Sequence, residues 1–337
     1  MTAEPLARPW LAPFTPAYRL ALALHELTLR LGMRSVRRLG GPVISIGNLS
    51  IGGAGKTPLT IALAQALVRR GMDVDVLSRG YGRTDRDAMR VDPDGTAEQF
   101  GDEPLEIARA AGVPVFVAAR RYEAALLAET AQVGKPAAGV HLLDDGFQHR
   151  QLHRDVDIVL LNRGDWHGRL LPAGELREPR KAVRRASCLV IPAEDRQLEA
   201  EIRESGWRGP IWRVRRRMEL PRIDGPVAAF CGIARPEQFF AGLEAGGMNL
   251  AARIVFADHY RYAAPDIERL IGIARKTGAA ACITTEKDRV RMGGLAQRFS
   301  GAPSFATAAL RMEIEDHDAA LAWLMDRIGP LSAASSR

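Results

Sequence analysis

The sequence predicts an α/β protein whose core is a mainly parallel β-sheet with helices on both faces. Short apolar segments alternate with helical stretches along most of the chain, which is the pattern of repeated strand-helix units. A smaller unit with the same alternation follows an Arg- and Pro-rich segment, and an amphipathic segment precedes the first strand. The length of 337 residues fits two domains of roughly 150 residues each.

The composition is that of a folded protein with an excess of basic residues. Hydrophobic residues make up 47% of the chain and charged residues 26%, which excludes disordered and collagen-like classes. The net charge of +7 favours a polyanionic partner, whether nucleic acid, anionic lipid or a phosphorylated substrate. Only five residues are lysine, so a lysine within a motif carries more information than an arginine.

The cysteines and the hydropathy pattern bear on the compartment. Cys188, Cys231 and Cys282 lie far apart, which excludes a disulfide scaffold and a Cys-rich zinc site and favours a reducing cytosol. The first residues lack the pattern of a signal peptide, and no run of about 18 apolar residues predicts a transmembrane span. We therefore expect a protein of the cytosol or of a membrane surface.

In chain order, the first expected element is an amphipathic helix within residues 1–38, with its helical pattern over 16–38. Such a helix either covers the core of its own domain, as most amphipathic helices do, or lies in a membrane interface. The pattern alone favours the first interpretation. The apolar face carries Leu20, Leu24, Leu27 and Leu31, and the basic face carries Arg19, Arg30, Arg34 and Arg37.

The next elements form a larger predicted domain, residues 39–215. Residues 208–226, rich in Arg and Pro, are expected to link it to a smaller α/β domain, residues 220–330. In the larger domain strands are expected at 43–46, 74–77, 113–117, 138–143, 158–161 and 188–191, and helices at 59–70, 104–111 and 120–132. In the smaller domain strands are expected at 227–231, 251–256 and 281–284, and helices at 237–245 and 265–277.

A glycine-rich loop between the first strand and the first helix of the larger domain has the context of a phosphate-binding loop. Its amides and the helix N-terminus would surround phosphates, Lys56 would reach the β- and γ-phosphate oxygens, and Thr57 would bind Mg²⁺. Ser50 stands where the usual pattern has its first glycine, and the alternative is a turn that binds nothing. The fold class is thus P-loop NTPase-like. The expected nucleotide-binding residues are Ser50, Ile51, Gly52, Gly53, Ala54, Gly55, Lys56 and Thr57.

An acidic pair, Asp144-Asp145, follows the apolar strand 138–143. In P-loop enzymes a carboxylate at this place holds Mg²⁺, directly or through water, so both residues are candidate metal ligands; the alternative is a solvated acidic turn. Two sequence features that are absent narrow the class of P-loop protein. Residues 285–288 do not form a guanine-reading motif, and Ile51 stands where membrane-switch ATPases with a similar loop carry lysine.

Several sequence blocks together resemble the tetraacyldisaccharide 4'-kinase (lipid A 4'-kinase) family. They run in order from about residue 43 to 290, and the block Asp144–His149 is far more specific than the phosphate loop alone. The matching blocks are Gly47–Pro58, Ser78–Arg83, Gly101–Pro104, Asp144–His149, Leu171–Gly174, Leu176–Glu178, Phe230–Pro236, Asp258–Tyr260 and Thr285–Asp288.

The resemblance implies transfer of the γ-phosphate of ATP, with Mg²⁺, to the 4'-hydroxyl of an acylated glucosamine disaccharide 1-phosphate. The product would be lipid IVA, a step of lipid A and lipopolysaccharide biosynthesis. The resemblance also implies that the N-terminal helix contacts the anionic cytoplasmic face of the inner membrane, as a peripheral protein without a transmembrane span, which reverses the preference stated above. No nucleic acid and no obligate protein partner are expected.

The resemblance further assigns roles to individual residues. Asp102 becomes the candidate base with His259 as its partner, although by sequence alone Asp102 begins a helix and His259 is an unassigned histidine. Because these two residues lie in different predicted domains, catalysis should require domain closure. Lys56 and Asp145 complete the catalytic set, and Glu178 would assist the nucleotide or Mg²⁺. Weaker substrate candidates are Arg79, Tyr81, Arg83, Arg120, Arg121, Gln148 and His149.

Three other functions remain possible from the sequence. A P-loop kinase for a soluble small molecule would not need lipid or the first 38 residues. A membrane-recruited P-loop ATPase switch would hydrolyse ATP without a phosphorylated product. A nucleic-acid-binding ATPase would explain the basic charge, but no helix-turn-helix, zinc finger or aromatic stacking surface supports it.

Overall fold

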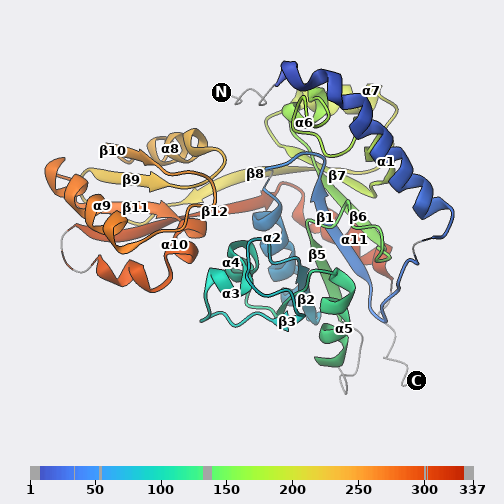
Figure 1. Cartoon of the computed structure of the whole chain (residues 1–337), viewed down its shortest axis with the longest axis horizontal. Helices are drawn as coiled ribbons and strands as arrows, with labels where there is room; N and C mark the ends of the chain where they lie inside the picture. The colour runs from blue at the N-terminus through green and yellow to red at the C-terminus, as the bar shows by residue number, and fades with distance from the viewer. Residues whose placement is uncertain are drawn as a thin grey trace.

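The structure is a computed structural model, and it describes residues 8–33, 35–52, 55–131, 139–299, 301 and 303–329. Figure 1 shows a larger part and a smaller part connected by two long strands. The larger part contains β1 (Val43–Asn48), β2 (Val74–Ser78), β3 (Met89–Arg90), β4 (Val115–Val117), β5 (Val140–Asp144), β6 (Val156–Leu160) and β7 (Cys188–Pro192). The connecting strands are β8 (Ile211–Glu219) and β12 (Ser304–Ile314), and the smaller part contains β9 (Val227–Cys231), β10 (Leu250–Val255) and β11 (Ala281–Thr285).

All of these strands belong to one 12-stranded sheet in the order β10-β9-β11-β12-β8-β7-β6-β1-β5-β2-β4-β3. The pairs β8–β12 and β3–β4 are antiparallel, and the other described pairs are parallel. The predicted mainly parallel sheet is therefore confirmed. Since β1 and β5 are neighbours, the residues that follow them meet at the same edge of the sheet.

Helices cover both faces of the larger part. One face packs against α2 (Lys56–Arg69), α4 (Asp102–Ala111) and α11 (His317–Ile328), and the other against α5 (Arg121–Ala131) and α7 (Arg196–Glu204). In the smaller part, α9 (Ala264–Lys276) lies on one face and α8 (Pro236–Ala245) on the other. The shorter helices are α3 (Ala97–Phe100), α6 (Arg163–His167), α10 (Glu286–Met292), and the 3-10 segments Pro9–Phe14, Arg180–Arg185 and Gly293–Arg298.

The expected linker 208–226 contains β8, a nine-residue strand. Arg213, Arg215 and Arg217 alternate with Val214 and Arg216 along the strand and so share one face, and Arg213 and Arg215 pair with Glu315, just beyond β12. After β12 the chain returns to the larger part, where Leu321 and Leu324 of α11 join the core of β1 and β6. The domain boundaries proposed from the sequence stay a prediction.

The N-terminal helix, α1 (Thr15–Arg30), is shorter than expected, because Gly32 takes a left-handed conformation and ends it. It runs along the outside of the larger part (Figure 1) and contacts it through Tyr18 and Leu22. Its leucine face does not cover a core, since Leu20 is 61% exposed and Leu24 54% exposed. No helix among the described residues is both long and apolar enough to span a membrane.

Candidate active site

The phosphate loop connects β1 to α2 at the edge of the sheet where the parallel strands end. Gly55 has a φ of +93°, and a Cβ at this position would lie 2.7 Å from Cε of Met312. Only glycine fits this close turn into α2. Earlier in the loop, the Ile51 amide donates a hydrogen bond to the Glu175 carbonyl at 2.8 Å, which fixes the start of the loop.

The remaining loop residues are placed as follows. Ser50 is buried and forms a β-bridge with Leu176, and Gly52 has a φ of +105°. Thr57 is buried in the first turn of α2. The expectations for Gly53, Ala54 and Arg34, and for the side chain of Arg30, lie outside the described residues.

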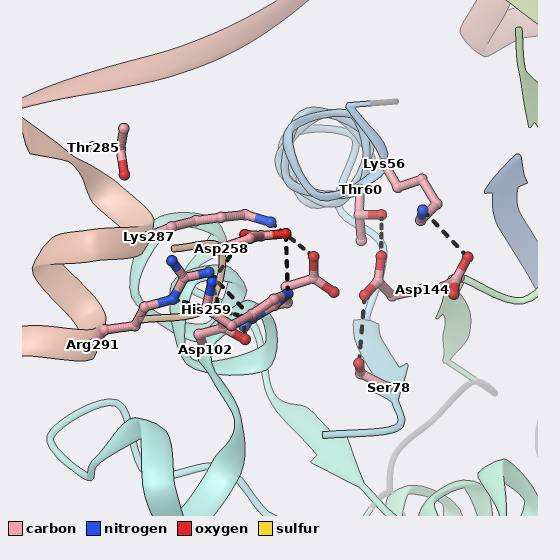
Figure 2. Close-up of polar contacts among 12 residues, drawn as sticks. Lys56, Thr60, Ser78, Asp102, Asp144, Asp258, His259, Thr285, Lys287 and Arg291 are labelled. Carbon is pink, nitrogen blue, oxygen red and sulfur yellow. Dashed lines mark hydrogen bonds and ion pairs between the residues drawn. The ribbon is translucent and has the colours of Figure 1, made fainter. Parts of the chain in front are cut away.

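Lys56 begins α2 and turns its ammonium group toward the end of β1. Its Nζ donates a hydrogen bond to Oδ1 of Asn48 at 3.0 Å and lies 3.5 Å from Oδ1 of Asp145. Figure 2 shows the Lys56 side chain on the side of the site where Asp144 lies. A helix N-terminus, a glycine turn and a nearly buried lysine together form a site that suits a polyphosphate.

Asp144 is the last residue of β5 and pairs in register with Ile46 of β1. From the side chains that the structure describes, it receives two long hydrogen bonds, both of 3.4 Å, from the hydroxyls of Thr60 and Ser78 (Figure 2). Burial, and then the charges of Glu103 and Asp145, raise the pKa of Asp144 to about 7. A cation at this carboxylate would favour its ionised form.

Asp145 has the opposite electrostatic environment. Although burial alone would raise its pKa, two hydrogen bonds from Arg177 and the charge of Lys56 hold the pKa of Asp145 well below its usual range. The Arg177 guanidinium donates to Oδ1 at 2.8 Å and to Oδ2 at 2.9 Å. Asp145 is also one of two non-glycine residues with positive φ among those described, at 49°.

The donor set at this edge fits Mg²⁺. Asp144 and Asp145 supply carboxylate oxygens and Thr57 a hydroxyl, which are the hard ligands that Mg²⁺ prefers, and its remaining ligands are usually phosphate and water. Among the residues that the structure describes, no cluster of three or more His, Cys, Asp or Glu could hold a metal. Such a cluster is not needed for an ion carried by a nucleotide.

Asp102, the first residue of α4, is 6% exposed and contacts residues of the smaller part. Its Oδ2 lies 3.0 Å from Nδ1 of His259 and accepts hydrogen bonds from Nε and Nη2 of Arg291 at 2.8 and 2.6 Å. Burial opposes the ionised form, but His259 and Arg291 lower the pKa of Asp102 well below its usual range. The same hydrogen bond raises the pKa of His259.

Glu103, the residue after Asp102, connects the Asp102 group with the acidic pair beside Lys56 through its charge. Its charge acts on Asp144, and its Oε1 accepts a hydrogen bond from Nζ of Lys287 at 2.8 Å. Figure 2 shows the Asp102 and Lys56 groups in one view. The structure therefore brings the proposed base toward the phosphate loop.

Some of the weaker substrate candidates gather around Asp145. Arg121 is 7% exposed, and burial lowers its pKa to about 10 with a contribution from Arg79, while Asp145 opposes the shift. Burial and the charge of Arg121 lower the pKa of His149 to about 4, so this histidine is neutral near pH 7. Gln148 donates to the Asn48 carbonyl at 2.9 Å.

Other candidates lie elsewhere. The ring of Tyr81 is exposed, 5.7 Å from that of His259. Arg83 packs against Gly80. The side chain of Arg120 is 82% exposed and lies 3.7 Å from Glu123, and Glu178 pairs with Arg185 at 2.8 Å.

Sequence reasoning missed Asn48, Arg177 and Arg291. Arg177 lies within a matching block, and Arg291 follows one by three residues, but each is one of many arginines in the chain. Only the fold distinguishes them, because their partners are 32 and 189 residues away in the sequence.

Comparisons with known proteins identify the family of the chain. The family model of tetraacyldisaccharide-1-P 4'-kinase matches residues 7–329. A tetraacyldisaccharide 4'-kinase of Koribacter versatilis is 42% identical over 320 residues, which cover 92% of this chain and 96% of the relative. One of Geobacter metallireducens is 37% identical, covering 86% of this chain and 89% of the relative.

A solved structure supports the same assignment. The crystal structure of an "apo" form of LpxK from Aquifex aeolicus in complex with ATP matches with a TM-score of 0.74 and 31% identity. The match covers 95% of this chain and 99% of that one. The chain thus belongs to the tetraacyldisaccharide 4'-kinase family.

Proposed function

We propose that this protein transfers the γ-phosphate of ATP to the 4'-hydroxyl of a tetraacyldisaccharide 1-phosphate and so forms lipid IVA. The observation that carries the proposal is the Asp102–His259 pair, which Figure 2 shows in the same close-up as Lys56, in a chain whose family has this activity. Phosphoryl transfer requires little covalent chemistry from the protein, so positioning and charge are the main tasks of these residues.

On the nucleotide side, the loop amides and Lys56 hold the phosphates of ATP. Arg177 and Lys56 keep Asp145 ionised, and Thr57 and Asp144 complete the oxygen donors for Mg²⁺. The ion, when bound, neutralises charge on the transferring phosphate. Because ADP leaves with additional negative charge, the nearby cations stabilise the later stage of the transfer more than the earlier one.

On the acceptor side, Asp102 takes the proton of the attacking hydroxyl, and His259 holds it in place. The carboxylate is ionised at neutral pH, as a base must be, and the imidazole can share the proton as it moves. Since Asp102 belongs to α4 and His259 to the loop before α9, the pair is complete only when the two parts of the molecule are together. This supports the proposed dependence of catalysis on closure.

The basic residues near Asp145 suit the phosphorylated sugar. Burial and the nearby charge of Arg79 disfavour the charged form of Arg121, and an anion beside these two guanidinium groups would relieve the repulsion. Arg forms paired hydrogen bonds with phosphate oxygens, so we assign these side chains to a phosphate of the substrate.

The exposed leucine face of α1 supports contact with the cytoplasmic face of the inner membrane. Leu20, Leu24 and Leu27, together with Trp10 and Phe14, would enter the acyl region, while Arg19 meets anionic headgroups. A substrate that carries four acyl chains resides in such a membrane, so the helix would place the active site beside it.

The test is to incubate the purified protein with γ-labelled ATP, Mg²⁺ and the disaccharide 1-phosphate in mixed micelles. The proposal predicts a labelled lipid. Label on a soluble acceptor instead would indicate a small-molecule kinase, and inorganic phosphate without labelled lipid would indicate an ATPase switch. Either of these results would overturn the proposal.

A further inference from the structure

Two basic side chains of α10 lie against the first turn of α4, across the contact between the two parts of the molecule. They are Lys287 and Arg291, one helical turn apart, and they pair with the consecutive carboxylates Glu103 and Asp102. Arg291 is the more enclosed of the two, with its side chain 6% exposed against 26% for Lys287. Nε and Nη2 of Arg291 both donate hydrogen bonds to one oxygen of Asp102, Oδ2.

The Arg291 guanidinium is itself held by a buried network of the smaller part. Its Nη1 lies 3.3 Å from Oδ1 of Asp288, which is fully buried. The same oxygen accepts hydrogen bonds from the Tyr262 hydroxyl at 3.0 Å and the Gly232 amide at 3.1 Å. The position of the cation is therefore fixed by the smaller part before it meets Asp102.

Asp102 needs such a partner. A buried carboxylate is strongly disfavoured unless it is paired and hydrogen-bonded. The other described partner of Oδ2 is His259, and the side chain of His259 is 44% exposed. Its Oδ1 accepts only the Glu103 amide among the described contacts, at 3.0 Å. Without Arg291, the carboxylate would depend on one exposed imidazole for its charge and its orientation.

We propose that Arg291 is a positioning residue, which holds the Asp102 carboxylate in the orientation that the transfer reaction requires. The inference rests on the proposed function, since it takes Asp102 to be the base. It adds that the smaller part supplies two groups to this base: His259, which is accessible, and Arg291, which is enclosed.

The experiment compares Arg291→Met and Arg291→Lys with the wild-type chain in the labelled-ATP assay. We expect Arg291→Met to lower kcat by about 10²-fold, the size of effect that misplacement of a reacting group produces, with a KM for ATP within about threefold of wild type. Arg291→Lys keeps one charged donor and should recover about tenfold of this loss, because the contact is to a single oxygen.

The matched control is Arg289→Met, on the same helix, where the guanidinium donates to the Gly293 carbonyl at 3.0 Å. Its kcat should be that of wild type. The inference is overturned if Arg291→Met keeps a kcat within about threefold of wild type, if Arg291→Lys is no better than Arg291→Met, or if Arg289→Met loses as much.

Circular dichroism and thermal unfolding establish that each variant is folded. Should Arg291→Met not fold, Arg291→Gln decides: a lowered kcat with an unchanged KM for ATP supports the inference, and a wild-type kcat overturns it. A wild-type chain that yields no labelled lipid overturns both proposals, whereas an active wild type with an unaffected Arg291→Met overturns this inference alone.

Discussion

Around Lys56, the polar partners come from the edge of one sheet, Asn48 from β1 and the carboxylate of Asp145 directly after β5. Around Asp102, the partners are His259 and Arg291, which are 157 and 189 residues away and belong to the smaller part. The first group is fixed by strand pairing within the larger part. The second group depends on how the two parts of the molecule meet, so it should be the more sensitive to their separation.

The largest effect is expected at the phosphate-loop lysine. Lys56→Met removes the cation nearest the end of β1, and we expect kcat to fall by about 10³-fold, since this charge stabilises the transferring phosphate. Steady-state kinetics with labelled ATP provide the measurement. Lys181→Met, at an exposed lysine, serves as the control; equal losses in the two variants would contradict the assignment.

A smaller loss is expected on the other side of the site. His259→Ala removes the accessible partner of Asp102, and turnover should fall by about 10²-fold, the range for acid-base groups. The KM for ATP should change little, because the lysine group remains intact. A variant with near-normal turnover would refute the pairing of Asp102 with His259.

The sequence indicates the residues around Lys56 from local patterns, and the Asp102 group only through family resemblance. A strand, a glycine loop, Lys56-Thr57 and an acidic pair after another strand are local patterns, and parallel strands bring such ends together. Arg291 and Arg177 carry no local signal, because their roles depend on partners distant in the chain.

The fold shows the same division. Residues 208–226 are predicted to be a linker because the segment is rich in Arg and Pro, and the structure places β8 within it. Arg213, Arg215 and Arg217 of this strand are paired with Glu313 and Glu315 in or near β12. This compensation between strands is not visible in either segment alone. The sequence indicates the leucine face of α1, but the exposure of this face depends on how the whole larger part packs.

A further test concerns α1, which belongs to neither charged group. Leu24→Glu places a charge on the exposed leucine face and should weaken binding to vesicles of anionic phospholipid by about tenfold, the loss expected for one buried leucine. Flotation of vesicles measures this binding. Leu126→Glu makes the same change at a 44% exposed position of α5 and should bind as wild type; equal weakening would contradict the membrane role of α1.

A further effect is expected on the stability of the folded protein. Because burial raises the pKa of Asp144 to about 7, the folded protein binds a proton that the unfolded chain has lost between about pH 4 and pH 7. The free energy of unfolding should therefore fall as the pH rises through this range. The raised pKa of His259 also makes the free energy of unfolding fall as the pH rises. The contribution of Asp144 must therefore be separated by comparing wild type with a variant.

Urea unfolding in EDTA at about pH 5 and about pH 7.5 provides that comparison. The difference between the two midpoints should be smaller in Asp144→Asn than in wild type. Identical differences would show that Asp144 does not titrate in this range.

The central claim is that both groups act on one reaction, the phosphorylation of the disaccharide lipid. Phosphorus NMR and mass spectrometry of the lipid after incubation with ATP and Mg²⁺ test this claim most directly. The account predicts a second phosphomonoester, on the 4' position, formed by wild type and formed far more slowly by Lys56→Met and His259→Ala. ADP and inorganic phosphate without a doubly phosphorylated lipid would contradict it.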